Sequence, residues 1–245
     1  MLNLMLFSYI NYYLLGIVLV PGILLALYAQ VKLTRTYNRC NTIQAQSGKT
    51  GKEVARLLLD TAGLQDIDIH TQGGDLSDYY DHRHKVVSLS PNSAQNSTVG
   101  AIGVATHEIG HALQYKAHYF PIKLRSFAIV FSNISSQLLW PLVLLGFIFG
   151  FGSTSATLGD YFMWAGIIVF GLAVIVNLVT LPVEFDASKR ALKILSTSGI
   201  LTQEETVEAR KMLNAAALTY VAALLISILN LLRFVLATKS DRRKR

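Results

Sequence analysis

Hydrophobic positions along the chain form four long apolar runs, separated by stretches that carry most of the charged residues. An α-helix needs about 20 apolar residues to cross a hydrocarbon core of about 30 Å, and each run is long enough to do so. The pattern therefore predicts four transmembrane helices followed by a basic tail. The predicted spans are residues 4–29, 127–150, 161–181 and 212–237, and the tail is 238–245.

The stretches between these runs, residues 30–126 and 182–211, show the patterns of short helices and strands. A Ser/Thr-x-x-Glu capping box at Thr50 predicts a short helix, and a second box at Thr202 predicts the start of the helix that becomes the last span. Alternation over 66–69 and 84–89 predicts a pair of strands. Ser97 or Thr98 can cap a helix over about 97–116. We therefore expect a mainly α protein, a four-helix bundle with a small α+β domain.

Composition agrees with a membrane protein, since 52% of the residues are apolar, 15% are charged and the mean hydropathy is +0.41. The net charge of +7 does not indicate nucleic-acid binding. Several basic residues, from Arg233 to Arg245, cluster at the end of the last apolar run, where membrane orientation explains them better. The single cysteine, Cys40, excludes a disulfide framework and a cysteine-based zinc site.

Basic residues near the membrane ends predict the orientation of the protein. An even number of spans places 30–126 and 182–211 on one side of the membrane and the C-terminal tail on the other. More basic residues flank the spans on the first side than on the second, so we expect the domain to face the cytoplasm. The first group is Lys32, Arg35, Arg39, Lys116, Lys123, Arg125, Lys189, Arg190, Lys193, Arg210 and Lys211, and the second is Arg233, Lys239, Arg242, Arg243, Lys244 and Arg245.

Residues 107–111 read His-Glu-Ile-Gly-His on the predicted helix over 97–116, an H-E-x-x-H motif. Positions i and i+4 lie on one helix face, so His107 and His111 can bind one zinc ion. Glu108 points away from the ligand positions and can serve as general base for a water activated by the metal. An ordinary helix with two structural histidines is the alternative, but burying these groups without a metal would be costly.

A catalytic zinc site needs a third protein ligand, and three residues compete for this place. The metzincin spacing fails because position 117 is alanine and His118 comes one residue too late. The intramembrane site-two protease pattern fails because the chain has only Gly159-Asp160, in reversed order. Glu184, which follows the third span, is the candidate that we prefer. Asp186 points about 200° away around the same helix, so the two carboxylates cannot both bind the ion.

Five segments of the chain carry further information, and they are 76–83, 89–91, 97–114, 182–192 and 214–223. Together they resemble the YugP-type bacterial integral-membrane neutral zinc metallopeptidases. The resemblance implies a gluzincin-like membrane protease of the bacterial cell membrane, with a zincin-like domain, one Zn²⁺ per chain and Glu184 as third ligand. It implies a distant relation to the HtpX-like proteases, which carry aspartate four residues after the ligand glutamate, where this chain has Ser188.

Four further residues are candidates for contacts with substrate or transition state. In gluzincin-like proteases an edge strand pairs with extended substrate, and the 84–89 stretch with Val87 could do so here. His82 and Arg83 precede that stretch and could equally form a structural turn. Tyr220 could stabilise an oxyanion, although a tyrosine near a membrane boundary more often anchors the helix at the interface.

The sequence thus predicts a zinc endopeptidase that cleaves membrane-associated or misfolded polypeptides near the bilayer. A second hypothesis is a zinc-binding membrane scaffold or chaperone without turnover. The presence of Glu108 favours the protease, because zinc binding alone requires no general base.

Overall fold

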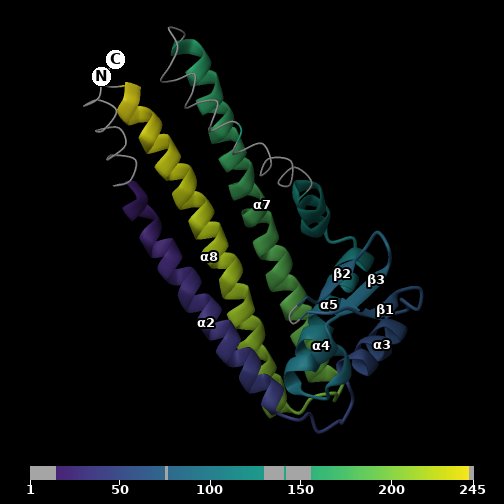
Figure 1. Ribbon diagram of the computed structural model, residues 1–245. Coiled ribbons are helices and arrows are strands. Elements are labelled where there is room, and N and C mark those ends of the chain that lie inside the picture. The colour runs from purple at the N-terminus through teal and green to yellow at the C-terminus, as the bar shows by residue number, and fades with distance from the viewer. Residues whose placement is uncertain (1–14, 75–76, 130–140, 142–155, 243–245) are drawn as a thin grey trace. The chain divides into compact units, whose positions relative to one another are not determined.

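The computed structural model in Figure 1 describes residues 15–74, 77–129, 141 and 156–242 of the chain. The chain divides into two compact units, which are described separately. The sheet-containing unit, as we call it, comprises Tyr28–Lys123 and Leu181–Thr219. The other unit comprises Met1–Leu27, Leu124–Thr180 and Tyr220–Arg245.

Three long helices in the described part of the chain are apolar enough to cross a membrane. The first candidate span, Gly16–Thr42, covers most of the 3₁₀-helix η1 (Leu15–Leu19) and all of α2 (Val20–Thr42). The other two candidates lie within α7 and α8. The second span predicted from sequence, 127–150, lies almost wholly outside the described residues, so the count of four spans stays a prediction.

Helix α7 (Ala156–Thr197) continues through Pro182. The sequence suggested that a helix starts or kinks at this proline, and the start is wrong because one helix runs from the third predicted span into the sheet-containing unit. A proline inside a helix removes one backbone hydrogen bond, a loss that a long helix with packed neighbours tolerates. Glu184 therefore lies on the same helix as a candidate membrane span, Trp164–Thr197.

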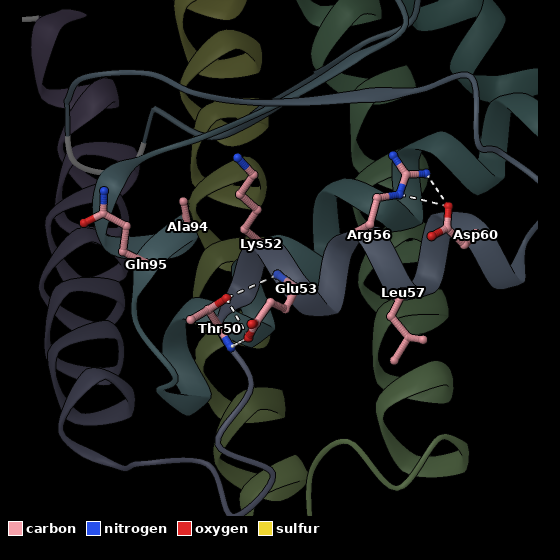
Figure 2. Close-up of a pocket in the computed structure, with 8 residues that line it drawn as sticks. All are labelled: Thr50, Lys52, Glu53, Arg56, Leu57, Asp60, Ala94 and Gln95. Atoms are coloured by element: carbon pink, nitrogen blue, oxygen red, sulfur yellow. Dashed lines mark hydrogen bonds and ion pairs between the residues drawn. The ribbon is translucent and has the colours of Figure 1, made fainter.

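Two capping boxes start helices as predicted. At the start of α3 (Gly51–Thr61), the backbone N–H of Thr50 donates to the Glu53 carboxylate at 2.8 Å, and Glu53 N–H donates back to the Thr50 hydroxyl at 3.3 Å (Figure 2). At the start of α8 (Gln203–Arg242), Thr202 and Glu205 exchange the same two bonds at 2.8 and 3.2 Å. Each box satisfies backbone donors that have no partner within the helix.

The sheet has three strands, β1 (Asp68–Thr71), β2 (Tyr79–Asp81) and β3 (Val86–Leu89), in the order β1-β3-β2. Strands β1 and β3 are parallel, and β2 is antiparallel to β3. The sequence predicted only β1 and β3, because the three residues of β2 are too few to show a period-two alternation. The expected pair of strands is therefore corrected to a three-stranded sheet.

Strand β3 lies in the middle of this sheet, which contradicts its predicted role as a substrate-binding edge. Val87 is paired with Ile69 on one side and with Tyr80 on the other, and its side chain is fully buried. Its backbone is therefore occupied within the sheet. Strands β1 and β2 are the two outer strands of the described sheet.

Helix α5 (Val99–Lys116) is largely buried within the sheet-containing unit. It begins at Thr98, whose hydroxyl accepts a hydrogen bond from Ala101 N–H. The short helix α4 (Pro91–Gln95) precedes it. Ile102 and Ile109 of α5 are fully buried, and burial of each contributes about 1.5–3 kcal/mol to folding. A well-packed helix of this kind holds its polar side chains in fixed positions.

Candidate metal centre

The two histidines of the H-E-x-x-H motif lie on one face of α5, as their spacing requires. The ring centroids of His107 and His111 are 4.9 Å apart and nearly perpendicular. Gly110, between them, faces α7, and a Cβ atom there would lie 2.6 Å from the carbonyl oxygen of Ala187. The motif glycine thus allows α5 and α7 to approach closely enough for a residue of α7 to reach the histidines.

Glu184 of α7 is that residue. Its Oε2 atom lies 3.3 Å from Nε2 of His107 and 3.6 Å from Nε2 of His111. The ligand atoms of the three residues all lie within 4.8 Å of one another. The side chain of Glu184 is only 2% exposed, and the side chain of His107, at 16%, is the most exposed of the three.

The donor set and its spacing fit a zinc ion. Two imidazole nitrogens and one carboxylate oxygen are a common protein ligand set for catalytic zinc. In a tetrahedral site with bonds of about 2.1 Å, neighbouring ligand atoms lie about 3.4 Å apart. The separations of 3.3 and 3.6 Å between Glu184 and the two histidines bracket this value. His107, His111 and Glu184 could therefore hold Zn²⁺.

Polar side chains contact the far ring nitrogens of both histidines. Gln114 Oε1 lies 3.0 Å from Nδ1 of His111, and Ser188 Oγ lies 3.3 Å from Nδ1 of His107. Gln114 is fully buried, and its Nε2 donates to the carbonyl oxygen of Val183 at 2.7 Å and to Oδ2 of Asp186 at 2.9 Å. Hydrogen bonds between α5 and α7 thus support the two histidines on the side of the ring that faces away from Glu184.

The rival third ligands are not part of this group. Asp186 Oδ2 accepts from Gln114 and, at 2.6 Å, from Nε of Arg190. His118 lies beyond the last residue of α5, with a left-handed φ of 51°, and is not among the converging ligands. His118 could approach the two histidines only if α5 broke soon after Gln114, and α5 instead continues to Lys116.

Glu108 follows His107 on α5 and is buried, with 7% of its surface exposed. It is not among the three residues whose ligand atoms converge. A carboxylate beside the centre but outside the ligand set is the arrangement that a general base needs.

The other predicted contact residues lie in different places. His82 is exposed, and its ring stacks on Tyr115 of α5 at 3.9 Å between centroids. Tyr80 of β2 packs edge-on against Tyr115, and burial raises the pKa of Tyr80 to about 12. Arg83 is exposed in the turn between β2 and β3. Tyr220 belongs to the other unit, and its role stays a prediction.

A turn joins β2 to β3 and holds the remaining histidine of this region. Asp81 Oδ1 accepts from the backbone N–H groups of Arg83 and His84, at 2.8 and 3.2 Å. Its Oδ2 atom lies 2.6 Å from Nδ1 of His84. The His84 ring, assisted by the two N–H groups and opposed by slight burial, holds the pKa of Asp81 below its ordinary value.

A depression on the surface over α3 and α4 is a separate feature (Figure 2). None of the predicted site residues lines it. Four of its polar side chains are engaged in structural bonds, since Thr50 and Glu53 cap α3 and Arg56 pairs with Asp60 at 2.8 Å. The lining residues are Thr50, Lys52, Glu53, Arg56, Leu57, Asp60, Ala94 and Gln95.

The sequence did not reveal that Gln114 and Ser188 contact the far ring nitrogens of His111 and His107. A signal for Gln114 was present, because it follows His111 by three residues on a helix that is otherwise small and apolar. A signal for Ser188 was present too, since it stands one turn after Glu184. The orientations that bring both to the histidines depend on how α5 packs against α7, which spacing along the chain does not determine.

Comparison with known proteins agrees with this geometry. A family described as "Putative neutral zinc metallopeptidase" matches residues 15–239. The chain is 41% identical over 212 residues to "Putative membrane protease YugP" of Bacillus subtilis (strain 168), covering 86% of this chain and 91% of that protein. No solved structure matches. The match extends over the helices that carry the motif and Glu184, and this chain therefore belongs to the family of neutral zinc metallopeptidases that the description names.

Proposed function

We propose that this protein is a zinc-dependent endopeptidase of the bacterial cell membrane, acting on membrane-associated or misfolded polypeptides. The observation that carries the proposal is the convergence of His107, His111 and Glu184 from two helices, with donor separations that suit tetrahedral zinc. One Zn²⁺ per chain would occupy this site. When bound, it would polarise the scissile carbonyl and lower the pKa of water.

The side chains around the metal have distinct tasks. His107, His111 and Glu184 hold the ion. Glu108 accepts a proton from the attacking water and delivers it to the leaving amine nitrogen, because it is a carboxylate adjacent to the ligands that binds no metal itself. The outward edge of β2 pairs with an extended segment of substrate through backbone hydrogen bonds.

The substrate class follows from the setting of the site. Helix α7 carries Glu184 and is also a candidate membrane span, which supports a site close to the bilayer. A polypeptide near the membrane surface is therefore the substrate that we expect. The lipid bilayer is the other partner.

Replacing Glu108 by Gln tests the proposal. Glu108→Gln should bind zinc as well as the unmodified protein does, because the ligands remain, and should cleave casein or a model membrane protein about a hundredfold more slowly or worse. Glu204→Gln makes the same chemical change at an exposed position of α8 and should have no effect. Loss of activity with phenanthroline and its return with Zn²⁺ complete the test.

The alternative is a zinc-binding scaffold or chaperone, for which Glu108 would be dispensable. Under that hypothesis the unmodified protein binds zinc and cleaves nothing, and Glu108→Gln keeps every measurable property. Substantial cleavage by zinc-loaded Glu108→Gln would contradict the role of the general base while leaving the metal centre intact.

We propose further that the sheet-containing unit faces the cytoplasm, from the count of basic flanking residues. Cys40 cannot report on this orientation, because its thiol is 1% exposed and contacts the carbonyl oxygen of Glu208. Single cysteines can replace it in a Cys40→Ser background. Lys49→Cys, at an exposed position, should resist an impermeant thiol reagent in intact cells, and Arg245→Cys should react. The reverse pattern would invert the orientation.

A further inference from the structure

Gln114 stands at the junction between the two helices that form the metal centre, and no part of the proposed chemistry uses it. Its side chain is fully buried and is bonded through both ends of its amide. A buried amide with all of its contacts inside the protein is expensive to maintain unless its bonds are well made. This arrangement calls for an explanation.

The contacts of Gln114 decide which way its amide points. The Nε2 end faces the carbonyl oxygen of Val183 and a carboxylate oxygen of Asp186, and both groups accept hydrogen bonds. The flipped amide would place its own oxygen 2.7 and 2.9 Å from these two acceptors, a repulsive contact on both sides. The NH₂ group therefore faces α7, and Oε1 faces His111.

This orientation in turn decides the tautomer of His111. Gln114 Oε1 can only accept, so the hydrogen bond at 3.0 Å requires the proton on Nδ1 of His111. In a neutral imidazole the other nitrogen, Nε2, then carries the lone pair. That atom is the one turned toward Glu184 and the proposed metal position.

His107 has no equivalent support. Its Nδ1 atom lies 3.3 Å from the Ser188 hydroxyl, which is a longer contact and a group that either donates or accepts. Ser188 can therefore satisfy either tautomer of His107. The centre thus has one histidine whose tautomer is imposed and one whose tautomer is not.

We propose that Gln114 is a positioning residue that holds His111 in the tautomer able to bind the metal and joins the histidine helix to the helix that carries Glu184. The inference rests on the proposed function for its purpose, although the tautomer itself is a property of the metal-free chain. Partners behind metal-bound histidines typically change metal affinity about 10- to 100-fold when they are removed. We expect the loss of zinc affinity on replacing Gln114 to fall within that range, and the loss on replacing Ser188 to be smaller.

The test uses the full chain in detergent, with Gln114→Met, which keeps the length of the side chain and removes both bonding groups. Gln95→Met makes the same change at an exposed position of α4 and serves as the control. Ser188→Ala removes the weaker contact. Ring nitrogen-15 shifts of metal-free protein at about pH 8, above the ordinary imidazole pKa, report the tautomer. His111→Asn identifies the His111 signals, and competition with a chelator gives the zinc affinity.

The unmodified protein and Gln95→Met should show His111 protonated at Nδ1, and Gln114→Met should show a mixture of tautomers with zinc affinity weakened about 10- to 100-fold. Ser188→Ala should weaken zinc binding less than Gln114→Met does. If Gln114→Met lowers the melting temperature but keeps the tautomer and the zinc affinity, the residue is merely structural and the inference is overturned.

These results separate the inference from the proposed function. A chain that shows the tautomer change but cleaves no polypeptide supports the inference and contradicts the protease. A chain that cleaves polypeptides with zinc, and whose His111 tautomer and zinc affinity are indifferent to Gln114→Met, supports the protease and contradicts the inference.

Discussion

Two places in the sheet-containing unit combine two histidines with a carboxylate, and they differ in almost everything else. At the metal centre, His107 and His111 meet Glu184, which is 77 residues away in sequence and 2% exposed. At the turn after β2, Asp81 stands next to His82 and His84, and the side chains of Asp81 and His84 are 31% and 78% exposed. The residue types are the same, but only the first group converges on one point.

Backbone geometry explains the difference. Positions four apart on a helix present their side chains in the same direction, so His107 and His111 aim at one point, where Glu184 meets them. His82 and His84 lie two positions apart at the end of a strand, and their rings go to different partners, Tyr115 and Asp81. Closeness in sequence is therefore a poor guide to shared chemistry, whereas spacing matched to the local structure is a good one.

The largest effect that would test this comparison is the loss of the distant carboxylate. Glu184→Ala should bring zinc content close to zero and abolish cleavage, because two imidazoles alone hold zinc weakly. His118→Ala, a histidine on the same chain that lies outside the ligand group, should leave both unchanged. Metal analysis of the purified variants together with a cleavage assay checks this, and zinc retained by Glu184→Ala would assign the third ligand elsewhere.

A smaller effect should follow from separating the two helices of the centre. In Gly110→Ala the new Cβ atom would meet the Ala187 carbonyl oxygen at 2.6 Å, so α5 and α7 must move apart. Overpacking of this kind costs about 1–3 kcal/mol, and the shift should also weaken zinc binding. Gly73→Ala, near the sheet, meets no atom within 4 Å and should change neither. Thermal unfolding and chelator competition measure the two quantities, and equal behaviour of the variants would contradict the close approach.

The turn at Asp81 should give a still smaller effect, and one that depends on pH. Because hydrogen bonds lower the pKa of Asp81 in the folded protein, its contribution to stability is full above its unfolded pKa of about 3.9 and is lost as the pH falls through the folded value. Asp81→Ala should thus cost about 1 kcal/mol or less at neutral pH, since the group is partly exposed.

Comparing melting temperatures of Asp81→Ala and the unmodified protein at neutral pH and below about pH 4 checks this, because the difference should shrink on acidification. Zinc affinity should stay unchanged throughout. A loss of zinc binding in Asp81→Ala would mean that the two histidine groups are coupled, and the contrast between them would fail.

The sequence was informative where a physical rule connects spacing to geometry. The capping boxes at Thr50 and Thr202 and the apolar runs of α7 and α8 each obey such a rule, and the structure confirms them. Of the rival third ligands, Glu184 converges with the two histidines and His118 does not, and the role of Glu184 as a metal ligand stays a proposal.

The features that the sequence did not reveal depend on contacts between segments that are far apart in the chain. Strand β2 was missed because three residues carry too little pattern, and the central place of β3 depends on how β2 folds back on it. The role of Gln114 depends on which residues of α7 face it across the helix pair. The prediction that β3 is an edge strand was wrong for the same reason, because the residues of a strand do not show which strands pair with it.

Because 77 residues separate His107 from Glu184, the ribosome synthesises the two residues at different times. A ribosome adds about 5–20 residues per second, so Glu184 is made about 4–15 s after the first histidine of the motif. Val183 and Asp186, which orient Gln114, are made at the same late stage. Under the proposed function, the nascent chain would lack its third ligand during that interval, and the newly made protein would be unable to cut its neighbours before α7 has been synthesised.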